Sequence, residues 1–250
     1  MIFVIAAREI RSAFLSPIAW VMIGVIQIIL GFMTAFNLQT YIEFIQAQQH
    51  LSKVPFGVTD YVVVPQYGFL AVMMVFAMPL ITMRVFSDER RNKTLALLVS
   101  APISMTEIVL GKYVGLLFII IAMLAVYAIM PLSLLFISNL DFGLLASSML
   151  GIFLFMATSA AIGLFISSLT SNPIIAAILT FFSLLFLWIL SIAKGDSPTE
   201  FSLADLSLFQ HLEAFQRGIF SSSDFIYYIL FSLAFLVLAI RRLDSDRLQR

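Results

Sequence analysis

The chain has 250 residues, of which 62% are hydrophobic and only 11% are charged, whereas soluble domains average about 45–50% and about 25%. A water-soluble globule could not bury this much apolar surface, so we expect an all-α membrane protein whose solvent is lipid. Fourteen basic residues balance fourteen acidic ones, which argues against a nucleic-acid partner, and the absence of Cys excludes thiolate metal sites and cysteine nucleophiles.

The first predicted element is an amphipathic helix over about residues 2–14. Its apolar residues share one face at the helical period, whereas Arg8 and Arg11 lie on another. We expect this helix to lie in the cytoplasmic interface and the chain to turn into the membrane at Pro17. The alternative, that these residues extend the first span, is disfavoured by the three charges in the segment. The short run 2–7, with Arg after it, does not predict a cleavable signal peptide.

Charge-free stretches locate six membrane spans, because an ionised side chain at bilayer depth costs about 2.5–3.5 kcal/mol. About 20 helical residues cross the hydrocarbon core, so the long stretch 142–193 must hold two spans. Pro173 marks the start of the second, since it fits the first turn of a helix. The predicted spans are 17–38, 62–83, 113–138, 142–166, 173–193 and 224–240.

The distribution of Lys and Arg predicts that both termini lie in the cytoplasm. With the termini, the loop 84–112 and the turn 167–172 assigned to that side, it holds 11 of the 14 basic residues. An excess of basic residues in cytoplasmic segments is the usual determinant of orientation.

The cytoplasmic loop 84–112 has a charged half followed by an apolar half. Positive-inside charges alone would explain Arg84 and Lys112. They would not explain a leucine run in a loop, which needs lipid headgroups or a protein groove to cover it. After Pro102, Ser104 and Glu107 form an S-x-x-E capping box, which predicts the start of the next helix.

An outer segment is predicted to form a second amphipathic helix, over about residues 203–219. Its apolar stripe is Leu208, Leu212, Phe215 and Ile219. His211 lies on this helix. We expect a hydrogen-bonded or solvated histidine and not a metal ligand, because the chain has no Cys and no nearby second His.

Sequence motifs for chemistry are missing. GxxxxGK[ST], HExxH and GxSxG do not occur, so this chain is not expected to be an enzyme or to bind ATP, a metal or another cofactor itself. The interiors of the predicted spans contain no ionisable residue, which disfavours an ion-coupled carrier. Small residues recur instead, among them the pairs Gly111/Gly115 and Ser159/Gly163, and these indicate close helix packing.

The arrangement resembles the membrane subunits of type-2 ABC exporters, six-span permeases that work with a separate ATPase. The resemblance covers essentially the whole chain. The elements that carry it are the N-terminal helix, Asp88-Glu89-Arg90-Arg91 leading to Thr94-Leu95, Pro102, the segment 107–112, and the outer helix before the last span. Within that family, the stretch 206–218 is most similar to permeases related to gliding-motility GldF.

The resemblance implies a segment, 87–99, that couples the permease to the ATPase, with a second cytoplasmic contact at 167–172. Its expected contact residues are Asp88, Glu89, Arg90, Arg91, Thr94, Leu95 and Leu98. The family usually has Gly where this chain has Lys93, and often an acidic residue where it has Ala96. ATP and Mg would be held by the ATPase. The other expected partners are membrane lipid, a second permease in a homodimer or heterodimer, and a periplasmic or outer accessory subunit.

Two functions are consistent with this sequence. The first is a permease subunit in the bacterial cytoplasmic membrane that couples ATP hydrolysis to export. The alternative is a membrane anchor or mechanical adaptor, as in gliding-type systems, which relays ATPase motion to an outer partner and transports nothing.

Overall fold

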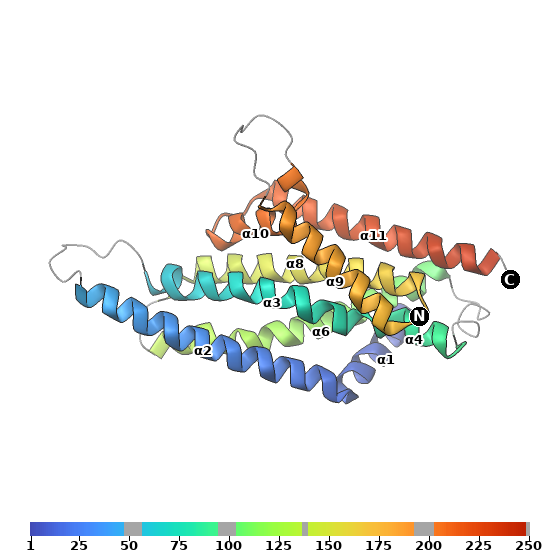
Figure 1. Cartoon of the computed structure of the whole chain (residues 1–250), viewed down its shortest axis with the longest axis horizontal. Coiled ribbons are helices and arrows are strands. Elements are labelled where there is room, and N and C mark those ends of the chain that lie inside the picture. Colours follow the sequence, from blue (N-terminus) through green and yellow to red (C-terminus); the bar gives the residue numbers. More distant parts are fainter. Residues whose placement is uncertain (48–56, 95–103, 137–139, 193–202, 249–250) are drawn as a thin grey trace.

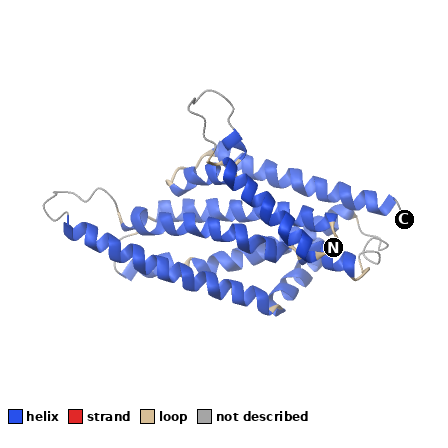
Figure 2. Ribbon diagram, in the orientation of Figure 1, coloured by secondary structure: helices blue, strands red, loops and turns tan. Residues whose placement is uncertain are grey.

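The computed structural model describes residues 1–47, 57–94, 104–136, 140–192 and 203–248. Within these ranges every regular element is a helix and there is no strand (Figure 2). Six helical segments of the described chain are long and apolar enough to cross a membrane. The predicted all-α, six-span architecture is therefore confirmed.

The helices follow one another in the order shown in Figure 1. The first half contains α1 (Ile2–Leu15), α2 (Pro17–Ala47), the π-helix η1 (Thr59–Val63), α3 (Val64–Thr82), α4 (Arg84–Arg91), α6 (Met105–Tyr127), α7 (Ile129–Ser133) and the 3₁₀ helix η2 (Leu134–Phe136). The second half contains α8 (Phe142–Leu169), α9 (Pro173–Leu190), the 3₁₀ helix η3 (Leu203–Leu206), α10 (Leu208–Gln216) and α11 (Ser222–Leu248).

Several helices extend beyond the predicted spans. Helix α2 continues past Glu43, and α11 continues past Arg241 and Arg242. A charge marks where apolar sequence stops, but the backbone hydrogen bonds of a helix do not depend on lipid, so the helix ends later than its apolar part.

Helix α8 is the centre of the bundle. It contacts α3, α6, α9, α10 and α11, and it is the most buried of the six spanning segments (Figure 1). Gly163 explains how one neighbour approaches so closely, because a Cβ there would lie 2.6 Å from the Cβ of Thr82 in α3. Gly151 has the same role toward α10, where a Cβ would lie 2.6 Å from the Cβ of Phe215. The small residues of α8 are therefore contact points between helices.

Helix α1 is a separate helix and not an extension of α2. Ser16 has an extended backbone (φ −81°, ψ 123°) that ends α1, and Pro17 begins α2 at an angle to it (Figure 1). One face of α1 packs on α6. At Gly111 and Gly115 of α6, an added Cβ would lie 3.1 Å and 3.2 Å from carbonyl oxygens of α1. The two helices therefore meet backbone to backbone.

The outer segment does not form one helix over 203–219. Ser207 caps α10 by accepting a hydrogen bond from the Phe209 N–H (3.2 Å), which separates η3 from α10. Gly218, at φ +75°, then ends the helical path, a conformation that glycine adopts without strain. The predicted stripe is buried only as far as Phe215, and Ile219 is exposed because it lies beyond this turn.

Candidate coupling site

Helix α4 carries the charged sequence that the resemblance assigns to coupling, and it continues almost directly from α3. Ser167 of α8 lies at the junction. Its hydroxyl accepts hydrogen bonds from the N–H groups of Phe86 (3.0 Å) and Ser87 (3.1 Å) and donates to the Met83 carbonyl (3.0 Å). A hydroxyl inserted among helical backbone groups is a recognised cause of a change in helix direction. The start of α4 is thus fixed to the end of α8.

Lys112 of α6 lies at the centre of a buried charge cluster beside α4. Its side chain is only 2% exposed. The ammonium donates to Glu89 Oε1 of α4 (2.9 Å) and to the Val85 carbonyl (2.8 Å), and it forms an ion pair with Glu9 of α1. It also lies 5.0 Å from the centre of the Phe86 ring. One side chain therefore joins three helices.

Arg90 forms a second connection from α4, to the end of the last helix. Its guanidinium pairs with Asp246 of α11, which also lies 3.6 Å from Arg242. Both side chains of the Arg90–Asp246 pair are 19% exposed. The inner face of α4 is consequently attached to α6, α8 and α11.

The opposite side of α4 faces outward and is charged. Arg84 is 53% exposed and lies 4.0 Å from Asp88, one turn further along the helix. Arg91 is also exposed. This outer face is exposed at Arg84 and Arg91, and its Arg84–Asp88 side also borders a cavity, whereas Glu89 and Arg90 are directed into the chain.

The helix ends at residues 92–94. Asn92 donates its backbone N–H to the Asp88 carbonyl (2.9 Å), and the Thr94 hydroxyl donates to the Glu89 carbonyl (3.3 Å). Lys93 lies in the left-handed region at φ +58°, and among the described residues it is the one non-glycine with positive φ. Glycine is the residue that adopts this conformation most easily, so the backbone at this position is one that the Gly expected from the resemblance would also favour.

The remaining predicted site residues fall into two groups. Leu95 and Leu98, with the rest of 95–103, lie outside the described residues. Ser104 and Glu107 form the expected capping box: the Ser104 hydroxyl accepts from the Glu107 N–H (3.1 Å), and the Glu107 carboxylate accepts from the Ser104 N–H (3.2 Å). This cap fixes the start of α6, seven residues before Lys112.

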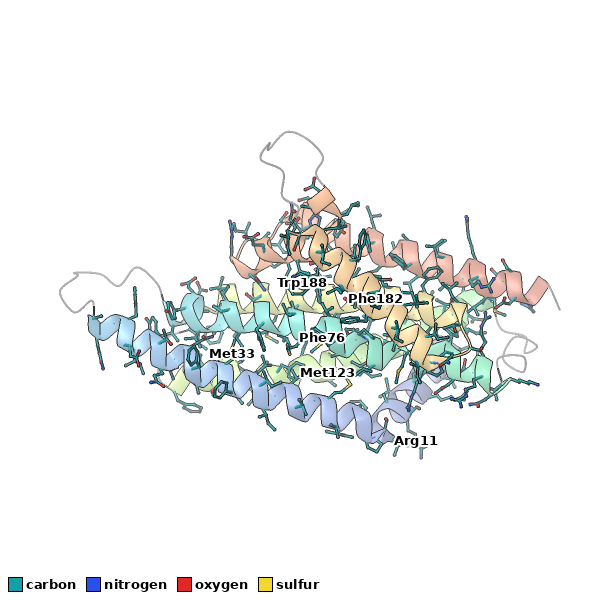
Figure 3. All side chains as sticks on the ribbon, in the orientation of Figure 1. Arg11, Met33, Phe76, Met123, Phe182 and Trp188 are labelled. Carbon is teal, nitrogen blue, oxygen red and sulfur yellow. The ribbon has the colours of Figure 1, made fainter. Side chains whose placement is uncertain are left out.

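A cavity of about 420 Å³ lies between α1, α2, α4 and α6. Its lining combines polar residues, mostly of α1 and α4, with apolar residues of α2, α3 and α6. Among the lining residues are Arg8, Ser12, Arg84, Met22, Ile119 and Met123. The side chain of Met123 lies within the bundle, and Arg11 projects from α1 close to its turn into α2 (Figure 3).

The turn 167–172 has two parts. Ser167 and Ser168 are buried, whereas Leu169, Ser171 and Asn172 are exposed close to α4, which contacts both α8 and α9. The exposed part belongs to the segment for which a second cytoplasmic contact was predicted, at the same end of the bundle as α4.

His211 lies in a separate polar cluster at the other end of the bundle. Its Nδ1 is 2.6 Å from the Asp224 carboxylate, its Nε2 is 2.9 Å from the Asp205 carbonyl, and its ring stacks on Tyr227. No group of three or more metal-binding side chains occurs in the part of the chain that the structure describes. The histidine therefore attaches α10 to α11.

No local sequence pattern indicates the roles of Glu9, Lys112, Ser167 and Asp246. Each pairs with a residue at least 23 positions away along the chain, so their contacts depend on how the helices assemble. The Gly111/Gly115 spacing was the nearest indication, because it marks the α6 face that receives α1.

A comparison with protein families matches residues 37–241 to the ABC-2 family of transporter proteins. The matched region includes α4, Lys112 and α8, but not α1. No curated protein sequence matches the chain significantly.

Proposed function

The chain belongs to the ABC-2 transporter family as a membrane permease subunit, and we propose that it couples ATP hydrolysis on a separate ATPase subunit to export. The observation that carries this proposal is the two-sided character of α4. Its outer face is charged and exposed, and its inner face is attached to α6, α8 and α11. A helix with this arrangement can receive a displacement from a partner and pass it to the bundle.

We assign the coupling residues to two roles. Asp88, Arg91 and Thr94 contact the ATPase through polar groups, and Leu95 and Leu98 supply the apolar anchor. Glu89 and Arg90 transmit the motion instead, since their side chains pair with Lys112 and Asp246 within the chain. The exposed residues 169–172 form the second contact.

The ATPase supplies the nucleotide chemistry in this scheme. ATP and Mg bind to the ATPase subunits, and closure of two such subunits displaces α4 in each of two permease copies. Because α8 contacts most of the other helices, a displacement at Ser167 reaches the centre of the bundle. The permease pair then changes the side of the bacterial cytoplasmic membrane to which its pathway opens.

The test is a double substitution in the apolar anchor. Leu95→Asp with Leu98→Asp is expected to leave membrane insertion intact, because these residues lie between the predicted spans. Co-purification of the ATPase in mild detergent should fall at least tenfold. The matched control is Ile219→Asp, which places a charge at an exposed apolar residue of the other end. Unchanged ATPase recovery with the anchor variant would contradict the coupling assignment.

The adaptor function is separated from export by a vesicle assay. An exporter moves cargo into sealed inverted vesicles in an ATP-dependent manner. An adaptor would bind and respond to the ATPase without such movement, and crosslinks from α10 would capture an outer protein. Helix α10 packs on α8, α9 and α11, and Glu213, whose side chain is 42% exposed, is the position from which such a crosslink is made.

A further inference from the structure

The charge cluster around Lys112 joins parts of the chain with different expected roles. Glu9 belongs to the N-terminal helix and lies 103 residues before Lys112, whereas Glu89 belongs to the coupling helix and lies 23 residues before it. Both carboxylates bind the same ammonium, and the site is largely closed to solvent, with exposed fractions of 2%, 23% and 13% for Lys112, Glu9 and Glu89.

Stability alone does not require such a cluster. Burying charges costs desolvation energy, and well-packed apolar residues of similar volume often serve equally well or better. Two carboxylates and one ammonium also leave one negative charge in excess, and Glu89 Oε2 is buried without a hydrogen-bond partner in the described structure. The cluster does, however, provide one thing that apolar contacts do not, which is a directional link between specific atoms of three helices.

Helices α1 and α6 are in close backbone contact. Gly111 and Gly115 allow the two backbones to touch, and a Cβ at either position would collide with α1. The Glu9–Lys112 pair lies between these two glycines along α6. Helix α1 therefore follows α6 closely, while its connection to α2 is a single extended residue, Ser16.

We propose that Lys112 is a positioning residue that locks the N-terminal helix to the coupling helix, so that α1 moves with α4 when the ATPase closes. The proposal rests on the coupling function given above and adds a second moving part to it. Motion of α1 about Ser16 also changes the walls of the cavity between α1, α2, α4 and α6. In this proposal the N-terminal helix is moved by the ATPase cycle, and it does more than lie at the membrane surface.

The test measures the motion of α1 directly in the complex of permease and ATPase. Because the chain has no Cys, spin labels can be attached at Arg11→Cys on α1 and Ser222→Cys at the far end of α11, both exposed positions. The distance distribution between them is recorded without nucleotide and after trapping with ATP and vanadate. The unmodified cluster should show a shift of the distribution on trapping.

Three variants separate positioning from simple stabilisation. Glu9→Gln removes the ion pair to α1 but keeps the backbone contact at Gly111 and Gly115, and Glu89→Gln removes the ion pair to α4 but keeps the hydrogen bond to the Val85 carbonyl. The triple variant Glu9→Gln, Glu89→Gln, Lys112→Met removes every charge of the cluster and the hydrogen bond to Val85 as well. We expect the triple variant to unfold within a few degrees of the parent, since no unpaired buried charge remains. All three should retain the ATPase; the triple variant should lose at least four-fifths of the nucleotide-dependent shift, and each single variant a smaller part of it. The control is Glu213→Gln, in an exposed ion pair of the other end.

The outcomes distinguish this inference from the proposed function. If the parent protein binds no ATPase, the proposed function fails and the inference fails with it. If the ATPase binds but the parent shows no shift, the proposed link between α1 and α4 is wrong while the coupling function stands. The same conclusion follows if the triple variant shows the full shift. Loss of the shift in a stable triple variant that still holds the ATPase supports the lock.

Discussion

The two ends of the bundle are held together in different ways. At the α4 end, ion pairs join residues that are far apart in the sequence: Lys112 and Glu9 are separated by 103 residues, and Arg90 and Asp246 by 156. At the α10 end, the partners of His211 lie only 13 and 6 residues away. The ion pairs of the α4 end therefore join α1, α4, α6 and α11, whereas the cluster around His211 attaches one short helix locally.

This difference predicts where substitutions should matter most. Removing a charge at the α4 end affects several helices at once, whereas a change at His211 loosens one attachment.

Lys112→Met should have the largest effect on stability. It leaves the partly buried carboxylates of Glu9 and Glu89 close together without the ammonium, and because breaking a fully buried ion pair costs about 3–5 kcal/mol, we expect a loss of about 3 kcal/mol. Denaturant titration in mixed micelles, followed by circular dichroism, measures the free energy of unfolding. A loss of unfolding free energy below about 1 kcal/mol would show that water replaces the ammonium in the cluster. The α4 end would then contribute no more to stability than the α10 end.

Gly163→Ala should lower the free energy of unfolding by about 1–3 kcal/mol, because its methyl group would overlap Thr82 and force α3 away from α8. The matched control is Gly24→Ala in α2, where no atom lies within 4 Å of the added Cβ. There the better helix propensity of Ala should stabilise the protein by about 0.5–1 kcal/mol. The same titration compares them, and equal effects would contradict the central packing of α8.

His211→Gln should cost about 1–2 kcal/mol, since one of two hydrogen bonds and the stacking on Tyr227 are lost at a single attachment. Limited proteolysis should then cut near α10 faster, while cleavage near α4 stays unchanged. Faster cleavage at both ends would mean that the His211 cluster stabilises the whole bundle to the same extent as the Lys112 cluster.

Lys93→Gly should produce the smallest change, and in the opposite direction. Glycine removes the steric cost of φ +58°, so the protein should gain up to about 1 kcal/mol. The thermal midpoint in detergent measures this gain, with Arg91→Gly as the control at a position of ordinary helical backbone. A lower midpoint for Lys93→Gly would show that its side chain makes a stabilising contact.

Much of the fold follows from the sequence, because apolar length and the positions of prolines and caps act locally. The break at Pro173, the separate helix before Pro17 and the Ser104–Glu107 cap are all set by residues within one or two turns. The outer helix was predicted too long, since Ser207 and Gly218 limit it more tightly than its apolar stripe suggested.

The coupling site was only partly predictable. Periodicity and resemblance located the charged helix, but they treated its four charged residues as equivalent. Which of them face inward depends on Lys112, Ser167 and Asp246, which come from three other helices. No local pattern determines that α1 folds back on Gly111 and Gly115 and brings Glu9 to Lys112.

The central claim is that the outer face of α4 contacts a nucleotide-hydrolysing partner. A cysteine-directed photocrosslinker at Arg91→Cys, compared with the same label at Arg217→Cys on the exposed surface near α10, tests this in native membranes. The account predicts that the Arg91 label captures a protein with Walker motifs, identified by mass spectrometry, and that the Arg217 label does not. Failure of the Arg91 label to capture such a protein, under conditions where the transporter is intact, would contradict the account.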